Sequence, residues 1–355
     1  MITSPLQSRV VAAAPAIHTY FDVVPESPDG KRLVYFRFDG KPLTWGTVVI
    51  QERATGREVE VTHCPGIPHS GAKQGWLDND HIYFSSDSQI YIATAEGQIT
   101  QKFAGSINTF CPTTRRGLAS SSNWHGAGRP PKECAIYRID IEDESLHELL
   151  DRDQAWEVVA AQMDLTGVRR DLLHFKNSKW APGGKRWFTV FTNEKDLPEH
   201  PDQPRVKVLI AADDQGGNVK LIGEFGHHPK WMPDGSAIYA FSGGNGAIAI
   251  WDADTGESRL LCRMPDEGHP SVHPDGKSIL SDGYENGEVA VYWQDLRTGE
   301  TQELSRAPHP EVDWQKQHPP YQVCHAHPVW SHDGQRIYFN ATVGEFPELR
   351  MIEVG

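Results

Sequence analysis

The fold of this chain is decided by a short segment that recurs along it, seen most clearly at residues 231–241, which read WMPDGSAIYAF. A tryptophan leads into Pro-Asp-Gly, and a run of alternating apolar residues follows. Asp-Gly supplies the positive φ of a tight turn, and the alternation is typical of a half-buried strand. The segment therefore predicts the first hairpin of a small antiparallel sheet.

Seven versions of this segment occur: SPDGKRLVYF (27–36), WLDNDHIYF (76–84), CPTTRRGLAS (111–120), WAPGGKRWFTVF (180–191), WMPDGSAIYAF (231–241), VHPDGKSILS (272–281) and WSHDGQRIYF (330–339). A second turn follows most of them, at 54–58, 95–98, 213–218, 254–258 and 297–301. The strands expected before two of these turns, Val48–Glu52 and Ala247–Asp252, also alternate. Dividing 355 residues by seven gives about 51 per repeat, close to the length of a propeller blade. We expect an all-β protein, a seven-bladed β-propeller with four-stranded antiparallel blades around a central channel.

The repeat also bears on domain organisation. A chain of 355 residues would ordinarily suggest two or three domains. Propeller blades bury their faces only against neighbouring blades, so we expect residues 1–355 to form one domain. The most irregular stretch, 121–176, predicts a loop excursion, and its segment Asp151–Asp164 is the nearest approach to an amphipathic helix.

Composition excludes some classes of function. With 34 Lys and Arg against 48 Asp and Glu, the net charge is −14, which argues against nucleic-acid binding through phosphates. No apolar run approaches the length of a membrane span, so we expect a soluble protein without a membrane partner. The five cysteines are odd in number and widely spaced, which favours the cytoplasm, or the periplasm if a signal peptide has been removed. Composition leaves the oligomeric state open.

Histidines recur at one register of the repeat. Seven residues before the turn glycine, the last three copies carry His-Pro at His228, His269 and His327; the other copies have Val23, Lys73, Phe110 and Asn177 there. This register begins the innermost strand, so we expect the residues to converge around the channel. The alternative is that His-Pro is a structural consensus that caps a turn. Tryptophans at a second register are expected to pack between blades: Trp76, Trp180, Trp231 and Trp330.

The last repeat carries a second histidine. His325 and His327 are two residues apart and would project from one face of a strand, whereas Gln322 would join them only through a bend or bulge. Two imidazoles from one strand, His269 from the preceding blade and an amide oxygen suit Mn²⁺, Fe²⁺, Zn²⁺ or Ni²⁺. The pattern therefore predicts a divalent-metal site between the last two repeats.

Three segments together resemble the oligogalacturonate lyases: GHPSVHPDGK (268–277), QVCHAHP (322–328) and the opening HTYFDVVPESPDGKRL (18–33). The turns alone also resemble Tol-type propellers, ulvan lyases and rhamnose–glucuronate lyases. The resemblance implies that His269, Gln322, His325 and His327 bind a divalent metal, most often manganese, with zinc, iron, nickel or calcium as alternatives. It also implies a histidine base from a preceding blade, best matched by His228, and an arginine near it, for which Arg205 is the candidate.

The implied reaction is β-elimination in an acidic oligosaccharide that contains uronic acid. A metal and an arginine would neutralise the uronate carboxylate, and a neutral histidine would take the proton from the adjacent carbon. His228 suits the role of base, with His174 as second choice. Substrate contacts are expected from Lys73, His125, Arg129 and Asn177, although His125 also fits an ordinary loop residue.

Two other classes of function stay open. One is another sugar-active enzyme on the same scaffold, such as an isomerase or hydrolase. The other is a non-catalytic Tol-type propeller that binds protein or glycan and has structural histidines. The net charge of −14 does not exclude an acidic sugar, because binding depends on the local field. The sequence does not indicate which uronide is cleaved or whether cleavage is exo or endo.

Overall fold

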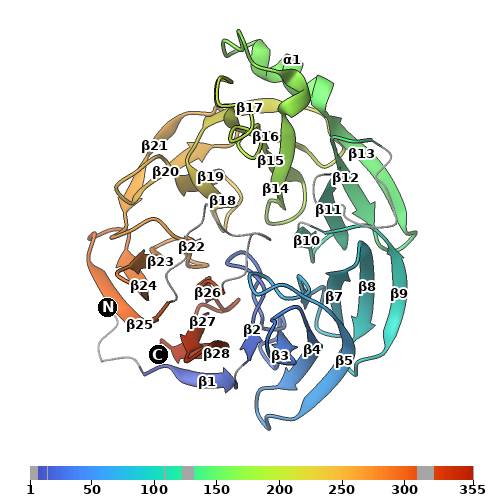
Figure 1. Cartoon of the computed structure of the whole chain (residues 1–355), viewed down its shortest axis with the longest axis vertical. Coiled ribbons are helices and arrows are strands. Elements are labelled where there is room, and N and C mark those ends of the chain that lie inside the picture. The colour runs from blue at the N-terminus through green and yellow to red at the C-terminus, as the bar shows by residue number, and fades with distance from the viewer. Residues whose placement is uncertain (1–6, 14, 108, 122–131, 310–323, 355) are drawn as a thin grey trace. The chain divides into compact units, whose positions relative to one another are not determined.

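The chain forms short antiparallel strands throughout, in a computed structural model that describes residues 7–13, 15–107, 109–121, 132–309 and 324–354. The strands make seven four-stranded sheets, the blades of a seven-bladed β-propeller (Figure 1). The predicted fold class is therefore confirmed. By contacts, the chain divides into a first unit (Met1–Lys102, Asn245–Ala247 and Cys262–Gly355) and a second unit (Phe103–Gly244 and Ile248–Leu261). The single domain expected for residues 1–355 stays a prediction.

The first unit holds four blades. In the order of their pairing these are β2 (Ala16–Ile17), β3 (Arg32–Phe38), β4 (Trp45–Glu52) and β5 (Glu58–Pro65); β6 (Gly75–Trp76), β7 (His81–Ser86), β8 (Gln89–Thr94) and most of β9 (Ile99–Ala104); β22 (Ser271–Val272), β23 (Ser278–Glu285), β24 (Glu288–Asp295) and β25 (Thr301–Pro308); and β26 (Val329–Trp330), β27 (Arg336–Val343), β28 (Phe346–Glu353) and β1 (Arg9–Ala12).

The second unit holds all or most of three blades and both described helices. Its strands are β10 (Thr109–Cys111), β11 (Arg116–Ser120), β12 (Ala135–Asp140) and β13 (Ser145–Asp151); β14 (His174–Trp180), β15 (Arg186–Thr192), β16 (Lys207–Asp213) and β17 (Lys220–Glu224); and β18 (His227–Trp231), β19 (Ala237–Phe241), β20 (Ala247–Asp252) and β21 (Ser258–Arg263). The helices are α1 (Arg152–Ala160) and the short 3₁₀ helix η2 (Arg170–Leu172).

The two chain ends complete one blade. The N-terminal strand β1 pairs antiparallel with the C-terminal strand β28, with Arg9 opposite Met351. Strands from opposite ends of the sequence thus share one sheet, which ties the first and last described residues into the first unit.

The turns of the repeat have the backbone that the sequence predicts. Five of the six aligned turn glycines lie in the left-handed region, with φ between 67° and 75°: Gly30, Gly184, Gly235, Gly276 and Gly334. The exception is Gly117, which lies within β11. Because L-residues rarely adopt this conformation, the Asp-Gly and related pairs set the strand register locally.

The repeated tryptophans link neighbouring blades, as predicted. Trp76 Nε1 donates to the Pro25 carbonyl of the preceding blade at 2.8 Å, Trp231 to Lys179 at 3.1 Å, and Trp330 to Ser271 at 3.2 Å. All three side chains are buried. Each indole therefore adds a directed bond to the apolar contact between two sheets.

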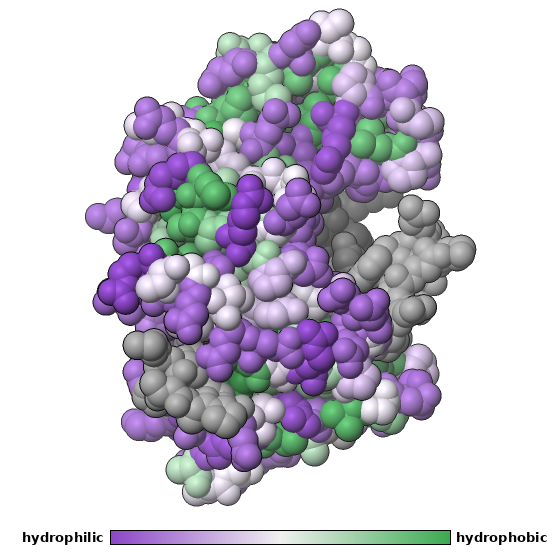
Figure 2. All heavy atoms as spheres, turned by 90° about the vertical axis from the view of Figure 1, so that its left-hand side faces the viewer, coloured by the Kyte–Doolittle hydropathy of each residue, from purple (hydrophilic) through white to green (hydrophobic). Residues whose placement is uncertain are grey.

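The hydrophobic cores lie between adjacent blades. In the first unit, Phe36 of β3 packs in one cluster with Trp76 and Phe84 of the next blade. In the second unit, Phe188 of β15 shares a cluster with Trp231 of β18. On the face drawn in Figure 2, apolar side chains form small groups among hydrophilic ones. Among the described residues, no helix has the length and apolar character needed to cross a membrane.

The excursion expected at 121–176 is present in its described part. It contains α1, which begins after the N-cap Asp151; the Asp151 carboxylate accepts from the Gln154 backbone N–H, and the Gln154 side chain accepts from that of Asp151. This capping box stabilises a helix of only nine residues, which buries Ala155 and Val159. The helix is shorter than the predicted candidate Asp151–Asp164, because Gln162 and Met163 form turns that end it.

Candidate metal centre

Four histidines from distant parts of the sequence meet in the first unit. His69, His325 and His327 each place one ring nitrogen within 4.8 Å of the others. His269 lies against them, with its ring centroid 4.4 Å from that of His327 and its Nε2 3.5 Å from His325 Nδ1. We call these four residues the imidazole cluster.

The segment carrying His325 and His327 is held by polar groups of other strands. Asn340 of β27 donates through Nδ2 to the His325 carbonyl at 3.1 Å, and its backbone N–H donates to the Ala326 carbonyl at 2.8 Å. The segment is not the regular strand that the sequence analysis assumed, because His327 has a left-handed backbone with φ of 47°. The two rings nevertheless approach to 5.4 Å between centroids, so the expected convergence occurs by a different backbone path.

Asp282 of β23 fixes His269. Its carboxylate accepts from the backbone N–H of His269 at 2.5 Å and lies 3.0 Å from the ring Nδ1. A carboxylate can only accept from that nitrogen, so Nδ1 carries the proton and Nε2 keeps its lone pair on the side of His325. Gly268 permits this approach, because a Cβ there would lie 1.9 Å from the Asp282 carbonyl oxygen.

His69 comes from the loop between β5 and β6. The loop closes on itself through backbone hydrogen bonds in both directions between Ile67 and Gly71. Gly71 has φ of 58°, and a Cβ there would lie 2.6 Å from Cβ of Phe36, so the loop packs directly on the first blade. This compact turn holds the His69 ring 4.8 Å from those of both His325 and His327.

Aromatic side chains surround the cluster. Tyr20 lies edge-on to His327 at 4.6 Å, and Phe21 lies 5.3 Å from His269. On another side, Tyr284 lies 5.3 Å from His325 and donates its hydroxyl to Asp282 at 2.8 Å. His309 packs on Tyr284 at 4.8 Å. The cluster thus sits in an environment that is largely aromatic and low in dielectric.

This environment favours neutral imidazoles. Burial lowers the pKa of His69 to about 3. Burial and neighbouring imidazoles also hold the pKa values of His325 and His327 far below the ordinary range. For Asp282, burial acts to raise the pKa, but its interactions with His269 and the hydrogen bond from Tyr284 outweigh it and lower the pKa. The site therefore combines lone pairs on imidazole nitrogens with one fixed carboxylate behind them.

The donor set fits a divalent transition metal. His327 is fully buried, and neither of its ring nitrogens has a hydrogen-bond partner among the described residues. A buried polar atom without a partner is costly unless something else satisfies it. A metal ion bound by imidazole nitrogens would do so, and neutral histidine with a carboxylate behind it is a frequent ligand arrangement.

The structure brings together three of the four predicted metal ligands, His269, His325 and His327. Gln322 lies outside the described residues, as do the predicted substrate contacts His125 and Arg129. The ligand role of all four residues stays a prediction, and so does the contact role of the other two.

The residue that begins the innermost strand, seven positions before the turn glycine, has a left-handed backbone in four blades. Lys73, Asn177, His228 and His327 all have positive φ, between 47° and 55°. In β14 and β18 the register residue coincides with a bulge, since pairing shifts between Lys176 and Lys179 and between His227 and Lys230. In these blades the position therefore has a backbone requirement as well as a side chain, and the alternative of a structural His-Pro consensus stays a prediction. Burial lowers the pKa of Lys73 to about 8.

The predicted base His228 lies on β18 in the second unit. Its ring stacks on that of His227, with centroids 5.0 Å apart and planes 13° apart. His227 in turn lies edge-on to Phe241 at 5.5 Å. Asn177 belongs to the neighbouring blade, on β14. The roles of His228 as base and Asn177 as substrate contact stay predictions.

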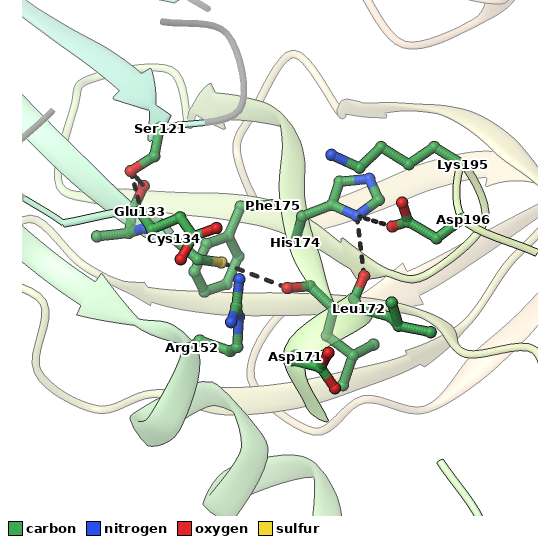
Figure 3. A pocket seen from close by; sticks show the side chains of 12 residues that line it. Ser121, Glu133, Cys134, Arg152, Asp171, Leu172, His174, Phe175, Lys195 and Asp196 are labelled. Carbon is green, nitrogen blue, oxygen red and sulfur yellow. Dashed lines mark hydrogen bonds and ion pairs between the residues drawn. The ribbon is translucent and has the colours of Figure 1, made fainter. Parts of the chain in front are cut away.

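The second-choice base His174 lines a cavity of about 230 Å³ in the second unit (Figure 3). Its Nδ1 lies 3.4 Å from the Leu172 carbonyl and 3.7 Å from the Asp196 carboxylate. Burial, followed by the charge of Lys195, lowers its pKa to about 4. His174 is therefore neutral at pH 7, but a base with so low a pKa takes protons weakly.

Arg205 belongs to a basic cluster of the second unit. Its Nη2 lies 2.5 Å from Glu194 Oε1, and the same carboxylate binds Lys207 Nζ at 2.8 Å and Lys176 Nζ at 2.9 Å. Burial acts to raise the pKa of Glu194, but the hydrogen bond from Lys207 and the charge of Lys176 lower it to about 2. Three cations share one carboxylate, so the four side chains together carry a net charge of +2 at pH 7.

Sequence reasoning missed His69 and Asp282. His69 lies only four residues before the register residue Lys73, a proximity that the repeat alignment did not use. Asp282 is a fully buried carboxylate in the continuously buried start of β23, SILSD, and a charge at such a position is itself a sign of a site. His18, in the opening segment, is also fully buried, and its ring lies 6.4 Å from His327.

Fold and site together define a class: a seven-bladed β-propeller with a buried imidazole cluster that fits a divalent metal. No family model matches the chain, and no curated protein matches its sequence.

Comparison with solved structures shows which known propellers this chain is similar to. The chain is similar to an oligogalacturonate lyase in complex with manganese, at a TM-score of 0.71 and 17% identity, covering 99% of this chain and 94% of that one. It is also similar to the oligogalacturonate lyase of Vibrio parahaemolyticus, at a TM-score of 0.72 and 16% identity, covering 99% and 95%. The β-propeller domain of a Myceliophteria thermophila protein matches at a TM-score of 0.56 and 12% identity, covering 97% and 99%. The resemblance to oligogalacturonate lyases is confirmed in structure, and at these identities it concerns the fold.

Proposed function

We propose that this protein is a metal-dependent lyase that cleaves uronic-acid-containing oligosaccharides by β-elimination. The observation that carries the proposal is the imidazole cluster, with His269 held by Asp282 on a propeller whose fold is similar to oligogalacturonate lyases. Buried neutral imidazoles backed by a carboxylate are suited to a divalent cation, for which the manganese complex of the similar structure favours Mn²⁺.

The reaction requires removal of a weakly acidic proton. The C–H bond next to the uronate carboxylate breaks, a carbon–carbon double bond forms, and the bond to the 4-linked sugar oxygen breaks so that this oxygen leaves and takes up a proton. A bound divalent metal supplies positive charge that stabilises the carboxylate as negative charge develops. His269, His325 and His327 would hold that ion, and Asp282 would keep the His269 lone pair turned toward it.

The remaining roles fall to residues of the second unit. His228 is the proposed base that takes the proton, with His174 as the second choice because its pKa of about 4 makes it a weak acceptor. Arg205, within the cluster of net charge +2 around Glu194, is proposed to attract the uronate carboxylate. This local excess of positive charge offers a way for a protein of net charge −14 to bind an acidic sugar.

Elimination gives a product that hydrolysis does not: an unsaturated uronide that absorbs in the ultraviolet. The test is to incubate metal-replete protein with oligogalacturonates and with oligomers of other uronic acids and to follow the ultraviolet absorbance. We expect a rise with at least one uronide, abolished by His325→Ala combined with His327→Ala. An exposed histidine changed in the same way, His63→Ala, is the matched control. Metal-bearing protein that gives no rise with any uronide would overturn the proposal.

A further inference from the structure

We propose that His69 is a metal ligand and that the centre is built from four imidazoles, those of His69, His269, His325 and His327. This inference rests on the metal dependence proposed above. It adds a residue from outside the ligand set that the resemblance implies and from a part of the chain at least 200 residues away from the other three histidines. Four neutral ligands would leave the ion its whole double positive charge for a substrate carboxylate.

The first argument for a four-histidine centre is the set of distances between the ring nitrogens. One ring nitrogen each of His69, His325 and His327 lie within 4.8 Å of one another, slightly beyond the greatest separation of two ligands of one ion, so metal binding requires a small inward shift of the rings. Nitrogens about 2.0–2.1 Å from a metal are roughly 3.0–4.2 Å apart, depending on the bond angle. His269 Nε2 lies 3.5 Å from His325 Nδ1, a separation that two ligands of one ion can have.

The second argument is that the loop carrying His69 is held in place by its own contacts. The turn from Ile67 to Gly71 is closed by two backbone hydrogen bonds and packs on Phe36, so its position does not depend on a ligand. His69 keeps part of its surface exposed, but its Nδ1 atom is buried. A ring held in place before metal binding loses little freedom on ligation.

The third argument is that the His69 ring packs against other imidazole rings. The described rings within 5.3 Å of it include those of Tyr20, His325 and His327, and the charge of Asp282 acts on it. A surface histidine that served only as a solubilising group would have no reason to pack edge-on against two buried imidazoles at 4.8 Å. In a metal centre this proximity has a function, because the ion offsets the cost of packing ring nitrogens together.

The experiment compares four proteins without a purification tag, each stripped with a chelator: wild type, His69→Ala, His325→Ala and the control His63→Ala, whose histidine is exposed on β5 and paired with Asp39. Each is titrated with Co²⁺ and with Mn²⁺, and the visible spectrum of the Co²⁺ form is recorded. We expect His69→Ala to weaken binding by at least about tenfold and to change the Co²⁺ spectrum, while His63→Ala behaves as wild type.

The outcomes separate this inference from the proposed function. If His69→Ala binds as wild type while His325→Ala does not, His69 is no ligand and the metal-dependent lyase still stands. If wild type binds no metal, both the metal dependence and the role of His69 are overturned. If His69→Ala fails to fold, a crystal of wild type soaked with Co²⁺ decides: a His69 nitrogen about 2.1 Å from the anomalous peak supports the proposal, and a water or another side chain in its place overturns it.

Discussion

Asp282 holds His269 by two bonds, accepting from its backbone N–H at 2.5 Å and from its ring Nδ1 at 3.0 Å. The same carboxylate accepts from the backbone N–H of His327 at 3.1 Å, so one buried charge positions histidines of two successive blades. This relationship links the fold to the site, because β23 carries the carboxylate and the loops before β22 and β26 carry the rings. It also defines the first test.

Replacing Asp282 with asparagine should weaken metal binding about 10–100-fold, the usual effect of losing a carboxylate behind a histidine ligand. The amide keeps the size of the side chain but removes the charge that sets the His269 tautomer. Titration of the folded, chelator-stripped variant with Co²⁺ measures the effect, with Asp295→Asn, a partly exposed residue at the end of β24, as control. Equal affinities of Asp282→Asn and wild type would show that Asp282 does not position the ligand.

Gly268→Ala should disrupt both stability and metal binding. Its Cβ would lie 1.9 Å from the Asp282 carbonyl oxygen, and because a backbone atom cannot swing away, β23 and His269 must separate. We expect a loss of about 3 kcal/mol in the free energy of unfolding, at the upper end for an overpacked site. The control is Gly276→Ala, which meets no atom within 4 Å and has φ of 75°.

The control should lose only about 1–2 kcal/mol, the cost of a left-handed residue, and should bind metal as wild type does. Urea unfolding and Co²⁺ titration of both variants check the prediction. If Gly268→Ala binds metal normally, the close approach of the two backbones is not required for the site.

Glu26→Ala should be the most destabilising change of a charged residue outside the cluster. The Glu26 carboxylate is 1% exposed and binds Arg336 through both oxygens, at 2.8 and 2.9 Å, and the Tyr338 hydroxyl at 2.5 Å. Removing it leaves the half-buried Arg336 paired with Asp333 at 2.7 Å and takes away the carboxylate that accepts from the buried Tyr338 hydroxyl, which costs up to about 3–5 kcal/mol. Thermal or urea unfolding measures the loss.

The matched control is Glu353→Ala. Glu353 pairs with Arg9 at 3.1 Å, but both side chains are more than 60% exposed. Such a surface pair contributes about 0–1 kcal/mol. A loss of similar size in the two variants would contradict the assignment of the Glu26 network as a link between β27 and the first blade.

The metal-free protein should lose stability as the pH falls from about 6.5 to about 4. Burial lowers the pKa of His18 and His174 to about 4, whereas in the unfolded chain they titrate near 6.5. In this window the unfolded state binds more protons, so stability rises with pH and falls on acidification, by on the order of 3 kcal/mol for a fully buried residue such as His18. A second loss should follow from about pH 4.5 to about 2 as Glu194 is protonated, since its folded pKa is lowered to about 2.

Urea unfolding in the presence of chelator, at a series of pH values, measures this dependence. His18→Asn should flatten the upper part of the profile because the substituted side chain does not titrate. A free energy of unfolding that stays constant between pH 6.5 and pH 4.5 would contradict the neutral, buried state of these histidines.

Much of the fold was predictable because the information for it is local. Asp29-Gly30 and Asp234-Gly235 define turns, the strands that follow alternate, and Trp231 precedes its turn at a constant distance. Positive φ at a glycine and the apolar run after it depend on neighbours in sequence, so the number and type of blades follow from the order of residues alone. The strands after the turns are nevertheless buried on both faces rather than at alternate residues, as in β19, where all five residues are buried. The same register placed His269 and His327 together correctly.

The composition of the site depended on contacts between distant residues. His69 reaches His325 only because the β5–β6 loop folds onto Phe36, and Asp282 meets His269 only because Gly268 lets two backbones approach to a distance that no side chain permits. The close approach of the His325 and His327 rings likewise comes from Asn340 and from the left-handed backbone of His327 rather than from strand alternation. Residue order therefore determined the repeating scaffold, through turns and alternation. Tertiary structure decided which histidines share one centre and which carboxylate orients them, because those choices depend on packing between segments that the sequence holds far apart.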